Sequence, residues 1–160
     1  MNGRDIIEKK LNIDYSRLHA YSTGLLQGKA YRALQFHLTK ALFPFDISIP
    51  EWKLLGQLCD HGPMKLIDLA EILDVKAPLV TRLSSQLEKK GLVRRENDPG
   101  DKRIKIIYLL LPGKRMLPVI EKRVKAKMER LLLGTSRPEL LTYVRVLARI
   151  VDNSLHNSSI

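Results

Sequence analysis

The stretch KAPLVTRLSSQLEKKGLVRRENDPGDKRIK, residues 76–105, decides the fold class of this chain. Its first half carries apolar residues at helical spacing, namely Leu79, Val80, Leu83 and Leu87. Gly91 suits the end of that helix, and two strand-like runs follow on either side of the turn signal at residues 97–100. This order predicts a polar-faced helix over 77–90 and a β-hairpin whose tip carries Lys102 and Arg103, which is the layout of a winged helix-turn-helix.

The face of this helix opposite the apolar residues carries short polar and basic side chains, which can reach phosphates and base edges in a major groove. We therefore predict double-stranded DNA as the partner, although the helix taken alone could be an ordinary solvated helix, and Arg82 could brace a turn or hold a phosphate. The residues expected to contact DNA are Lys65, Lys76, Ala77, Pro78, Thr81, Arg82, Ser84, Ser85, Arg94, Lys102 and Arg103.

Composition agrees with an anionic partner. The chain has 160 residues and a formal net charge of +11, and 44% of its residues are hydrophobic, which suffices for one packed domain with helical extensions. The positive charge lies on segments that also have apolar periodicity, so it decorates a fold. The single cysteine, Cys59, excludes an internal disulfide. Because no long apolar run or signal-peptide pattern is present, we expect a cytoplasmic protein without a membrane role.

The segments on either side of the winged region are predicted to be helical and to form a dimer interface. Residues 1–47 show two helical patterns, over 4–11 and 16–42, and residues 112–160 show two more. Capping boxes are expected at Ser48 with Glu51 and at Ser136 with Glu139. The last helix has a wide apolar arc that includes Leu140, Val144, Leu147 and Val151. Such an arc favours burial against a second copy, for which a two-fold homodimer is the simplest arrangement.

Residues 48–123 resemble the MarR (multiple-antibiotic-resistance regulator) family. The similarity lies in PEW at 50–52 with Leu55, LA at 69–70 with Leu73, VTRL at 80–83, LEKKGLVRR at 87–95 and DPGDKR at 98–103. One departure is LLLPG at 109–113, where the family often has Leu-Thr shortly before the glycine of the next helix. The resemblance implies a mostly α homodimer in which the winged helix-turn-helix at 48–111 is flanked by dimerisation helices.

The resemblance also implies roles for particular residues. The helix at 77–90 would read the major groove, Arg103 would enter the minor groove, and Asp101 would brace Arg103. Relatives bind small anionic ligands between the dimerisation helices and the winged domain. Candidate residues for such an effector pocket are Tyr31, Phe36, His37 and Trp52, although each could equally be an ordinary core residue.

Other kinds of site are not expected. No catalytic motif or phosphate-binding loop is present, so the chain is predicted not to be an enzyme and to need no cofactor. The four histidines do not fall at zinc-finger spacing, and no metal site is expected. Cys59 lies beside Leu55 and Leu58 on a helix, which favours a buried, inert thiol over a redox sensor.

The sequence therefore predicts a homodimeric, sequence-specific transcriptional regulator, most simply a repressor that a small molecule releases from a palindromic operator. Two rival interpretations stay open. One is an architectural DNA binder of low specificity. The other is a winged-helix protein that docks on an acidic protein and has no DNA role.

Overall fold

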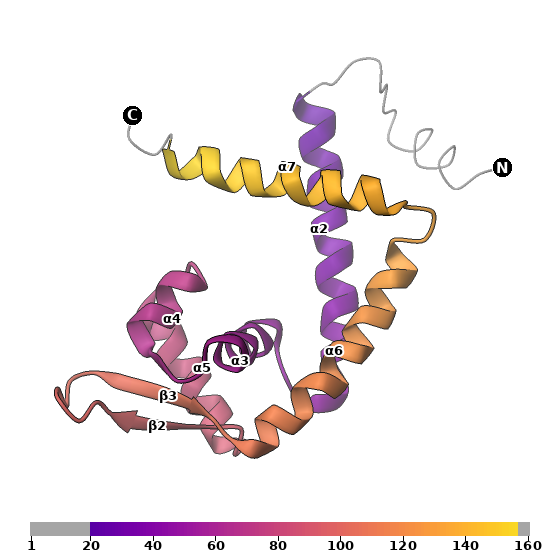
Figure 1. Ribbon diagram of the computed structural model, residues 1–160. Helices are drawn as coiled ribbons and strands as arrows, with labels where there is room; N and C mark the ends of the chain where they lie inside the picture. Colours follow the sequence, from indigo (N-terminus) through magenta and orange to yellow (C-terminus); the bar gives the residue numbers. More distant parts are fainter. Residues whose placement is uncertain (1–19, 157–160) are drawn as a thin grey trace. The chain divides into compact units, whose positions relative to one another are not determined.

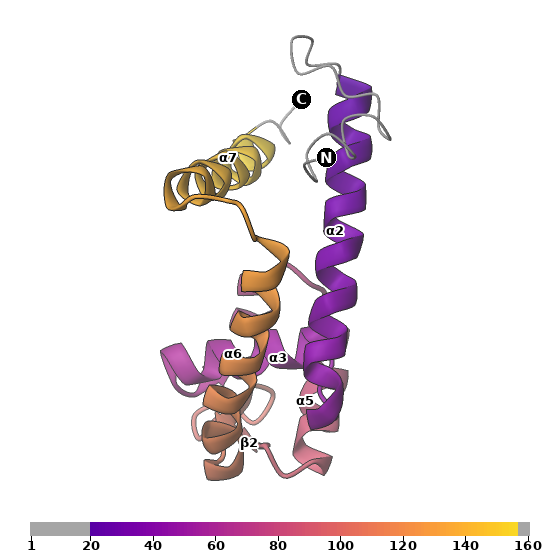
Figure 2. The ribbon, with the colours of Figure 1, turned by 90° about the vertical axis from the view of Figure 1, so that its right-hand side faces the viewer.

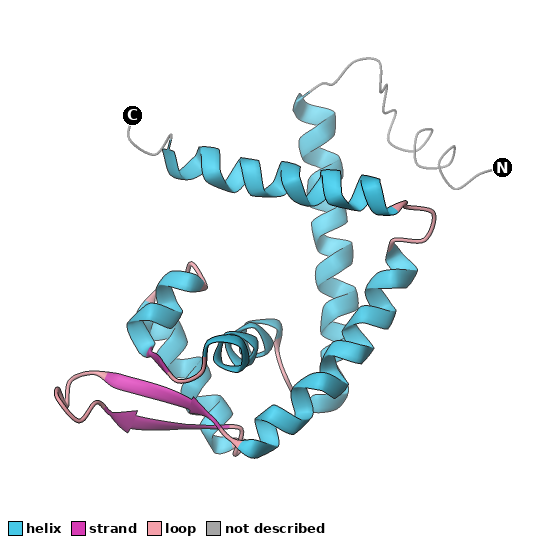
Figure 3. Ribbon diagram, viewed as in Figure 1, coloured by secondary structure: helices cyan, strands magenta, loops and turns pink. Residues whose placement is uncertain are grey.

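The computed structural model describes residues 20–156 and is mostly helical, with one small sheet (Figures 1 and 3). Its elements are α2 (Ala20–Leu42), the 3-10 helix η1 (Phe43–Phe45), α3 (Ile49–His61), β1 (Met64–Lys65), α4 (Leu66–Ile72), α5 (Ala77–Lys89), β2 (Val93–Asn97), β3 (Lys105–Leu109), α6 (Leu111–Leu131) and α7 (Arg137–His156). The chain divides after Met128 into two compact units. The helix predicted over 4–11 lies outside the described residues.

The predicted helices are confirmed where they are described, with ends that differ by a few residues. Figure 2 shows α2 as one long helix, which stops at Leu42 before Pro44. The predicted capping box opens α3, because the Ser48 side chain accepts a hydrogen bond from the Glu51 amide and Glu51 accepts one from the Ser48 amide. The second box, at Ser136 and Glu139, opens α7 in the same way.

The winged helix-turn-helix is built on a tight turn and a three-stranded sheet. Between α4 and α5 the chain turns at Asp74, which adopts a left-handed backbone with φ of 51°. The two predicted strands form an antiparallel hairpin, and the extended piece at Met64–Lys65 joins it as a third strand in the order β1-β3-β2. In the hairpin register, Arg94 lies opposite Tyr108 and Arg95 opposite Ile107.

One hydrophobic core holds the helices and the sheet of the winged region together. Leucines of α3 (Leu54, Leu55 and Leu58) pack with Val80, Leu83 and Leu87 of α5, with Ile107 of β3 and with Leu117 and Ile120 of α6. Burial of the apolar face of α5 leaves its opposite face to solvent. The start of α6 packs tightly, since a Cβ atom at Gly113 would stand 2.8 Å from the Leu92 carbonyl oxygen.

The second unit, residues 129–160, has no buried core of its own among the residues that the structure describes. Helix α7 has no buried residue. Its exposed large apolar side chains are Leu141, Tyr143, Val144, Val146, Ile150, Val151 and Leu155.

Candidate nucleic-acid interface

The exposed face of α5 forms a stripe of side chains one helical turn apart. Pro78, Arg82 and Lys89 are exposed and Ser85 is half-buried, and their positions repeat at intervals of four, three and four residues. The Arg82 side chain makes no hydrogen bond or ion pair with any residue that the structure describes, so its five donors face solvent. Lys89 was not among the predicted contacts, although the same spacing in the sequence points to it.

The prediction that Ser84 contacts DNA is wrong. Ser84 is fully buried, and its hydroxyl donates to the Thr81 carbonyl oxygen at 3.1 Å. The reason is geometric, because position 84 follows Val80 by one turn and Leu83 by one residue, and therefore falls in the buried sector of α5. Thr81 is exposed, but its hydroxyl donates to the Ala77 carbonyl, which leaves its oxygen as an acceptor only.

The tip of the wing, residues 98–104, is shaped by two aspartates. An Asp98 carboxylate oxygen accepts hydrogen bonds from the backbone amides of Gly100 at 2.8 Å and Asp101 at 3.2 Å. Asp101 in turn accepts from the backbone amide of Arg103 at 2.9 Å. The aspartates therefore organise the backbone, while the Lys102 and Arg103 side chains are exposed and have no partner among the described residues. In the described structure the Asp101 carboxylate therefore holds Arg103 by the backbone amide of Arg103.

The wing is tied to α5 by an ion pair. Glu88 of α5 accepts from the backbone amide and from the Nε and Nη2 atoms of Arg95 on β2, at 2.7 to 2.9 Å. These hydrogen bonds hold the pKa of the Glu88 carboxyl below its ordinary value. Arg95 therefore serves the fold, and its sequence neighbour Arg94 points to the other face of the hairpin.

Arg94 does not belong to the α5 surface. Its guanidinium pairs with Glu96 on the same strand and lies 4.5 Å above the centre of the Tyr108 ring. Of the remaining predicted contacts, two lie at the start of α5 and one lies on β1. Lys76 is exposed at the N-cap of α5, Ala77 is half-buried in its first turn, and Lys65 is exposed on β1. The structure thus brings most of the predicted contacts to α5 and the wing. Ser84 is buried away from this surface, and the Arg94 side chain lies on the face of the wing that pairs with Glu96 and Tyr108.

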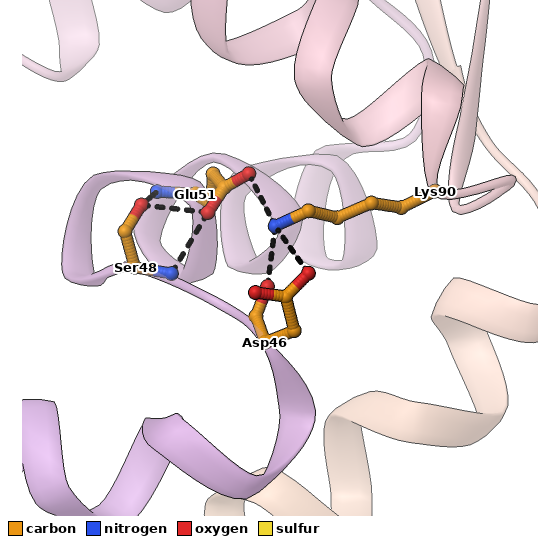
Figure 4. A network of polar contacts seen from close by, with 4 residues as sticks. All are labelled: Asp46, Ser48, Glu51 and Lys90. Carbon is orange, nitrogen blue, oxygen red and sulfur yellow. Dashed lines mark hydrogen bonds and ion pairs between the residues drawn. The ribbon is translucent and has the colours of Figure 1, made fainter.

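Lys90, at the end of α5, is engaged in a network with the start of α3, which Figure 4 shows. Its ammonium group lies 3.0 Å from a carboxylate oxygen of buried Glu51 and also bonds the Asp46 carbonyl. Burial raises the pKa of the Glu51 carboxyl, but hydrogen bonds from Ser48 and the pairing with Lys90 outweigh it, so the pKa falls below its ordinary value. Lys90 therefore positions α5 against α3.

The four residues predicted for an effector pocket do not share one cavity. Tyr31 lines a cavity of about 370 Å³ between α2, the start of α3 and α5, together with Gln35, Thr39, Lys53, Leu79 and Leu83. Trp52 lies elsewhere and donates its indole N–H to Glu121 of α6. Phe36 is exposed and stacks edge-on against His37. These three residues therefore do not belong to the cavity that Tyr31 lines.

The prediction of a buried Cys59 is also wrong, because its thiol is exposed. Cys59 is in the last turns of α3, one residue past buried Leu58, and that turn of the helix leaves it at the surface. Within the described residues, no cluster of three or more His, Cys, Asp or Glu side chains could hold a metal ion. None of the described helices is long and apolar enough to cross a membrane.

Together the fold and this surface define a winged helix-turn-helix protein. Residues 47–105 match the sequence profile of the MarR family. Among curated proteins, the chain is 28% identical to the uncharacterized HTH-type transcriptional regulator YfiV of Bacillus subtilis, over 68% of this chain and 70% of that protein. It is 34% identical to the similarly described YhbI of the same organism, over 54% of this chain and 56% of that protein, so the second match spans just over half of its relative.

Solved structures share the fold over most of both chains. A MarR-family transcriptional regulator from Rhodococcus sp. RHA1 superposes with a TM-score of 0.75 at 22% identity, covering 84% of this chain and 96% of that one. A mutant MarR from E. coli in complex with operator DNA gives 0.73 at 23% identity, over 79% and 91%. CouR from Rhodococcus jostii RHA1, bound to p-coumaroyl-CoA, gives 0.72 at 24% identity, over 80% and 90%.

Residues 47–105 therefore form a domain of the MarR family, and the chain is similar over about two thirds of its length to a curated HTH-type transcriptional regulator. Members of this family are transcriptional regulators and not enzymes, which is the class of protein that the sequence predicts.

Proposed function

We propose that this regulator is a homodimer that represses transcription from a palindromic operator and leaves the DNA when a small molecule binds. Two exposed surfaces, the α5 stripe and the wing tip, support the proposal that the chain binds DNA. Their Arg82 and Arg103 side chains have no partner among the described residues. The Glu88–Arg95 ion pair holds both surfaces to one body.

Each surface has a distinct task. Pro78, Thr81, Arg82, Ser85 and Lys89 would enter the major groove, where hydrogen bonds to base edges give specificity. Lys102 and Arg103 would reach the minor groove, and Lys65, Lys76 and Ala77 would contact the phosphate backbone. Asp101 would keep the wing tip in shape by holding the Arg103 amide.

A dimer is supported by the apolar surface of α7. Val144 and Val151 are each 59% exposed, and soluble chains rarely leave so many large apolar side chains in water. We propose that residues 1–47 and 112–160 form the dimer interface around the DNA-binding region at 48–111. Two copies would present two α5 helices about 34 Å apart, one turn of duplex, to successive major grooves.

Release by an effector is supported by the cavity at Tyr31. Its wall includes Leu79 and Leu83 of α5, so an occupant would touch the helix that reads DNA. The relative CouR was solved with p-coumaroyl-CoA bound, which shows that this fold can hold a small organic ligand. An effector would lower DNA affinity only as far as it prefers the chain's DNA-free shape.

Substitution of the wing arginine tests the DNA interface. Arg103→Ala should weaken operator binding by roughly 1–3 kcal/mol, the value of one good basic contact. Arg123→Ala removes the same charge from an exposed position on α6 and serves as the control. Fluorescence anisotropy with duplex from the chain's own upstream region gives both affinities. Equal affinities for the two variants and the wild type would remove the wing from the interface.

Dependence on salt separates the proposal from its rivals. With six phosphates neutralised, log affinity should fall against log salt with a slope of about −5. A slope near −1 contradicts a surface that follows the DNA backbone and favours docking on an acidic protein. Equal affinity for unrelated duplexes, together with a steep slope, favours the architectural binder.

A further inference from the structure

A second surface cavity, of about 430 Å³, lies at the base of the wing, where the end of α3, the two hairpin strands and the start of α6 meet. It shares no lining residue with the cavity at Tyr31. Its apolar wall includes Leu58, Pro63 and Leu110, and Cys59 also lines it. It therefore lies on a different side of α3 from the proposed effector cavity and belongs to the wing.

The polar part of this cavity is cationic. Arg94 and Lys114 line it, and no acidic side chain does. The Lys114 side chain is exposed and has no hydrogen-bond or ion-pair partner among the residues that the structure describes. Arg94 is already held in place, by Glu96 beside it on β2 and by the ring of Tyr108 directly across the hairpin. The cavity thus combines an apolar wall with two cationic side chains, of which Arg94 is held in place and Lys114 has no side-chain partner among the described residues.

We propose that this wing-base cavity is a binding site for a small amphipathic anion. Its anionic group would pair with Lys114 and with the guanidinium edge of Arg94 that Glu96 leaves open, because charge-assisted hydrogen bonds are the strongest polar contacts available there. Its apolar body would lie against the leucine wall. A carboxylate, a sulfonate or a phosphate each supplies a negative charge, so the class of ligand is defined by an anionic group joined to an apolar body.

An occupant would contact the parts that set the direction of the wing. The cavity wall includes Tyr108 and Leu109 of β3, and the chain leaving β3 is fixed by a 2.9 Å hydrogen bond from the Leu110 amide to the Leu92 carbonyl. This step rests on the proposed function. An anion bound here changes the affinity for DNA if it binds the free wing and the DNA-bound wing with different affinities. The binding itself does not depend on a DNA role.

The sole cysteine provides a direct reporter, because Cys59 is exposed and lines this cavity. The probe is 1-anilinonaphthalene-8-sulfonate, an amphipathic anion whose fluorescence rises in apolar surroundings. On the full-length wild-type chain, saturating probe should slow alkylation of Cys59 by iodoacetamide several-fold. An unchanged alkylation rate at saturation overturns the proposal, because the probe would then be bound elsewhere.

Charge-neutralising variants locate the anionic group. Lys114→Gln should weaken probe binding and Cys59 protection roughly tenfold, the equivalent of about 1.4 kcal/mol. Lys122→Gln, on the exposed side of the same helix, and Lys53→Gln, in the Tyr31 cavity, should leave Cys59 protection unchanged. Loss of protection in Lys53→Gln but not in Lys114→Gln overturns the proposal. Circular dichroism of each variant confirms that the chain is folded.

Addition of duplex DNA separates this proposal from the proposed function. If operator DNA changes the probe's apparent affinity for the wild type but not for Lys114→Gln, the site is coupled to DNA binding. If the wild type binds no DNA while the probe still protects Cys59, the proposed function fails and the anion site stands. If DNA binds tightly and the probe affinity does not change, the regulatory role of the site is overturned.

Discussion

Glu88 on the recognition helix accepts hydrogen bonds from the backbone amide and the guanidinium of Arg95 on the first wing strand, with the Nη2 atom at 2.7 Å. The two residues are seven positions apart, and the chain ends its helix and starts a strand between them. The ion pair therefore fixes the angle at which the wing leaves α5. Both side chains are partly exposed, at 36% for Glu88 and 28% for Arg95, so the stabilisation is modest.

We expect Glu88→Gln to reduce DNA affinity more than stability. Loss of the charge should cost about 1 kcal/mol or less in the free energy of unfolding, whereas a looser wing should weaken operator binding several-fold. Glu129→Gln, on the exposed side of α6, is the matched control. Urea unfolding and anisotropy titrations measure the two effects. If operator affinity in Glu88→Gln matches that of the control, the ion pair does not orient the wing.

The two carboxyls with lowered pKa values predict a direction of pH dependence. Glu88 and Glu51 both have folded pKa values below the ordinary 4.5. A depressed folded pKa adds stability above the unfolded pKa, and this stability is lost as pH falls through the folded pKa. Urea unfolding should therefore show a free energy that declines below about pH 4.5. Glu51→Gln should flatten part of that decline, and an unchanged slope would contradict the role of the Lys90–Glu51 contact.

Alanine substitutions at the neighbouring residues Ser84 and Ser85 test which face of the recognition helix reads the DNA. Ser85→Ala should relax base preference, because residue 85 shares the exposed stripe with Pro78 and Arg82. Ser84→Ala removes a buried hydroxyl that donates to Thr81 and should alter stability by roughly 1 kcal/mol without changing base preference. A selection over randomised duplexes distinguishes the two variants. Altered preferences in Ser84→Ala but not in Ser85→Ala would show that another face of α5 reads the bases.

Substitution of two helical glycines by alanine should change the free energy of unfolding in opposite directions. At Gly113 a Cβ atom would stand 2.6 Å from Leu109 Cδ1 and 2.8 Å from the Leu92 oxygen, so Gly113→Ala should destabilise by roughly 1–3 kcal/mol. At Gly56, in α3, nothing lies within 4 Å, and Gly56→Ala should stabilise by about 0.5–1 kcal/mol. Thermal unfolding of both variants tests this contrast. A stable Gly113→Ala would mean that the start of α6 can shift away from the wing.

Local patterns in the sequence predict much of this fold. The capping boxes at Ser48 and Ser136 mark two helix starts, since their geometry involves residues only three positions apart. The wing tip follows from the same kind of local chemistry at Asp98 and Asp101. The short strand Met64–Lys65 has only two residues, too few for a strand pattern in the sequence, and its partner Ile107 is far away along the chain.

The errors at the candidate site have physical causes. Ser84 is polar, and polarity alone places it with Ser85, but the buried sector of α5 is wide enough to include it. Arg94 and Arg95 are identical neighbours, and only the strand register decides that Arg95 meets Glu88 while Arg94 meets Tyr108. Contacts between distant segments likewise separate Tyr31 from Trp52, which hydrogen-bonds to Glu121.

The apolar arc of α7 leads to the last prediction, which concerns assembly. Val144 and Val151 are exposed and Leu147 between them is half-buried, so a second copy would cover this stripe. Leu147→Asp would place a carboxylate without a partner in that interface and should destabilise the dimer by several kcal/mol, roughly 3–5. Because one half-site provides too few contacts, operator binding should be lost although Leu147 is outside the DNA-binding surface.

Arg149→Asp is the control, because residue 149 lies about 200° around the helix from 147, on the side away from the stripe. It introduces the same carboxylate and should leave the dimer intact. Sedimentation equilibrium on the wild type and both variants measures assembly, and unfolding midpoints should rise with protein concentration for a dimer. A wild-type chain that stays monomeric at micromolar concentration and still binds a palindromic site tightly would contradict the dimer and the half-site spacing that depends on it.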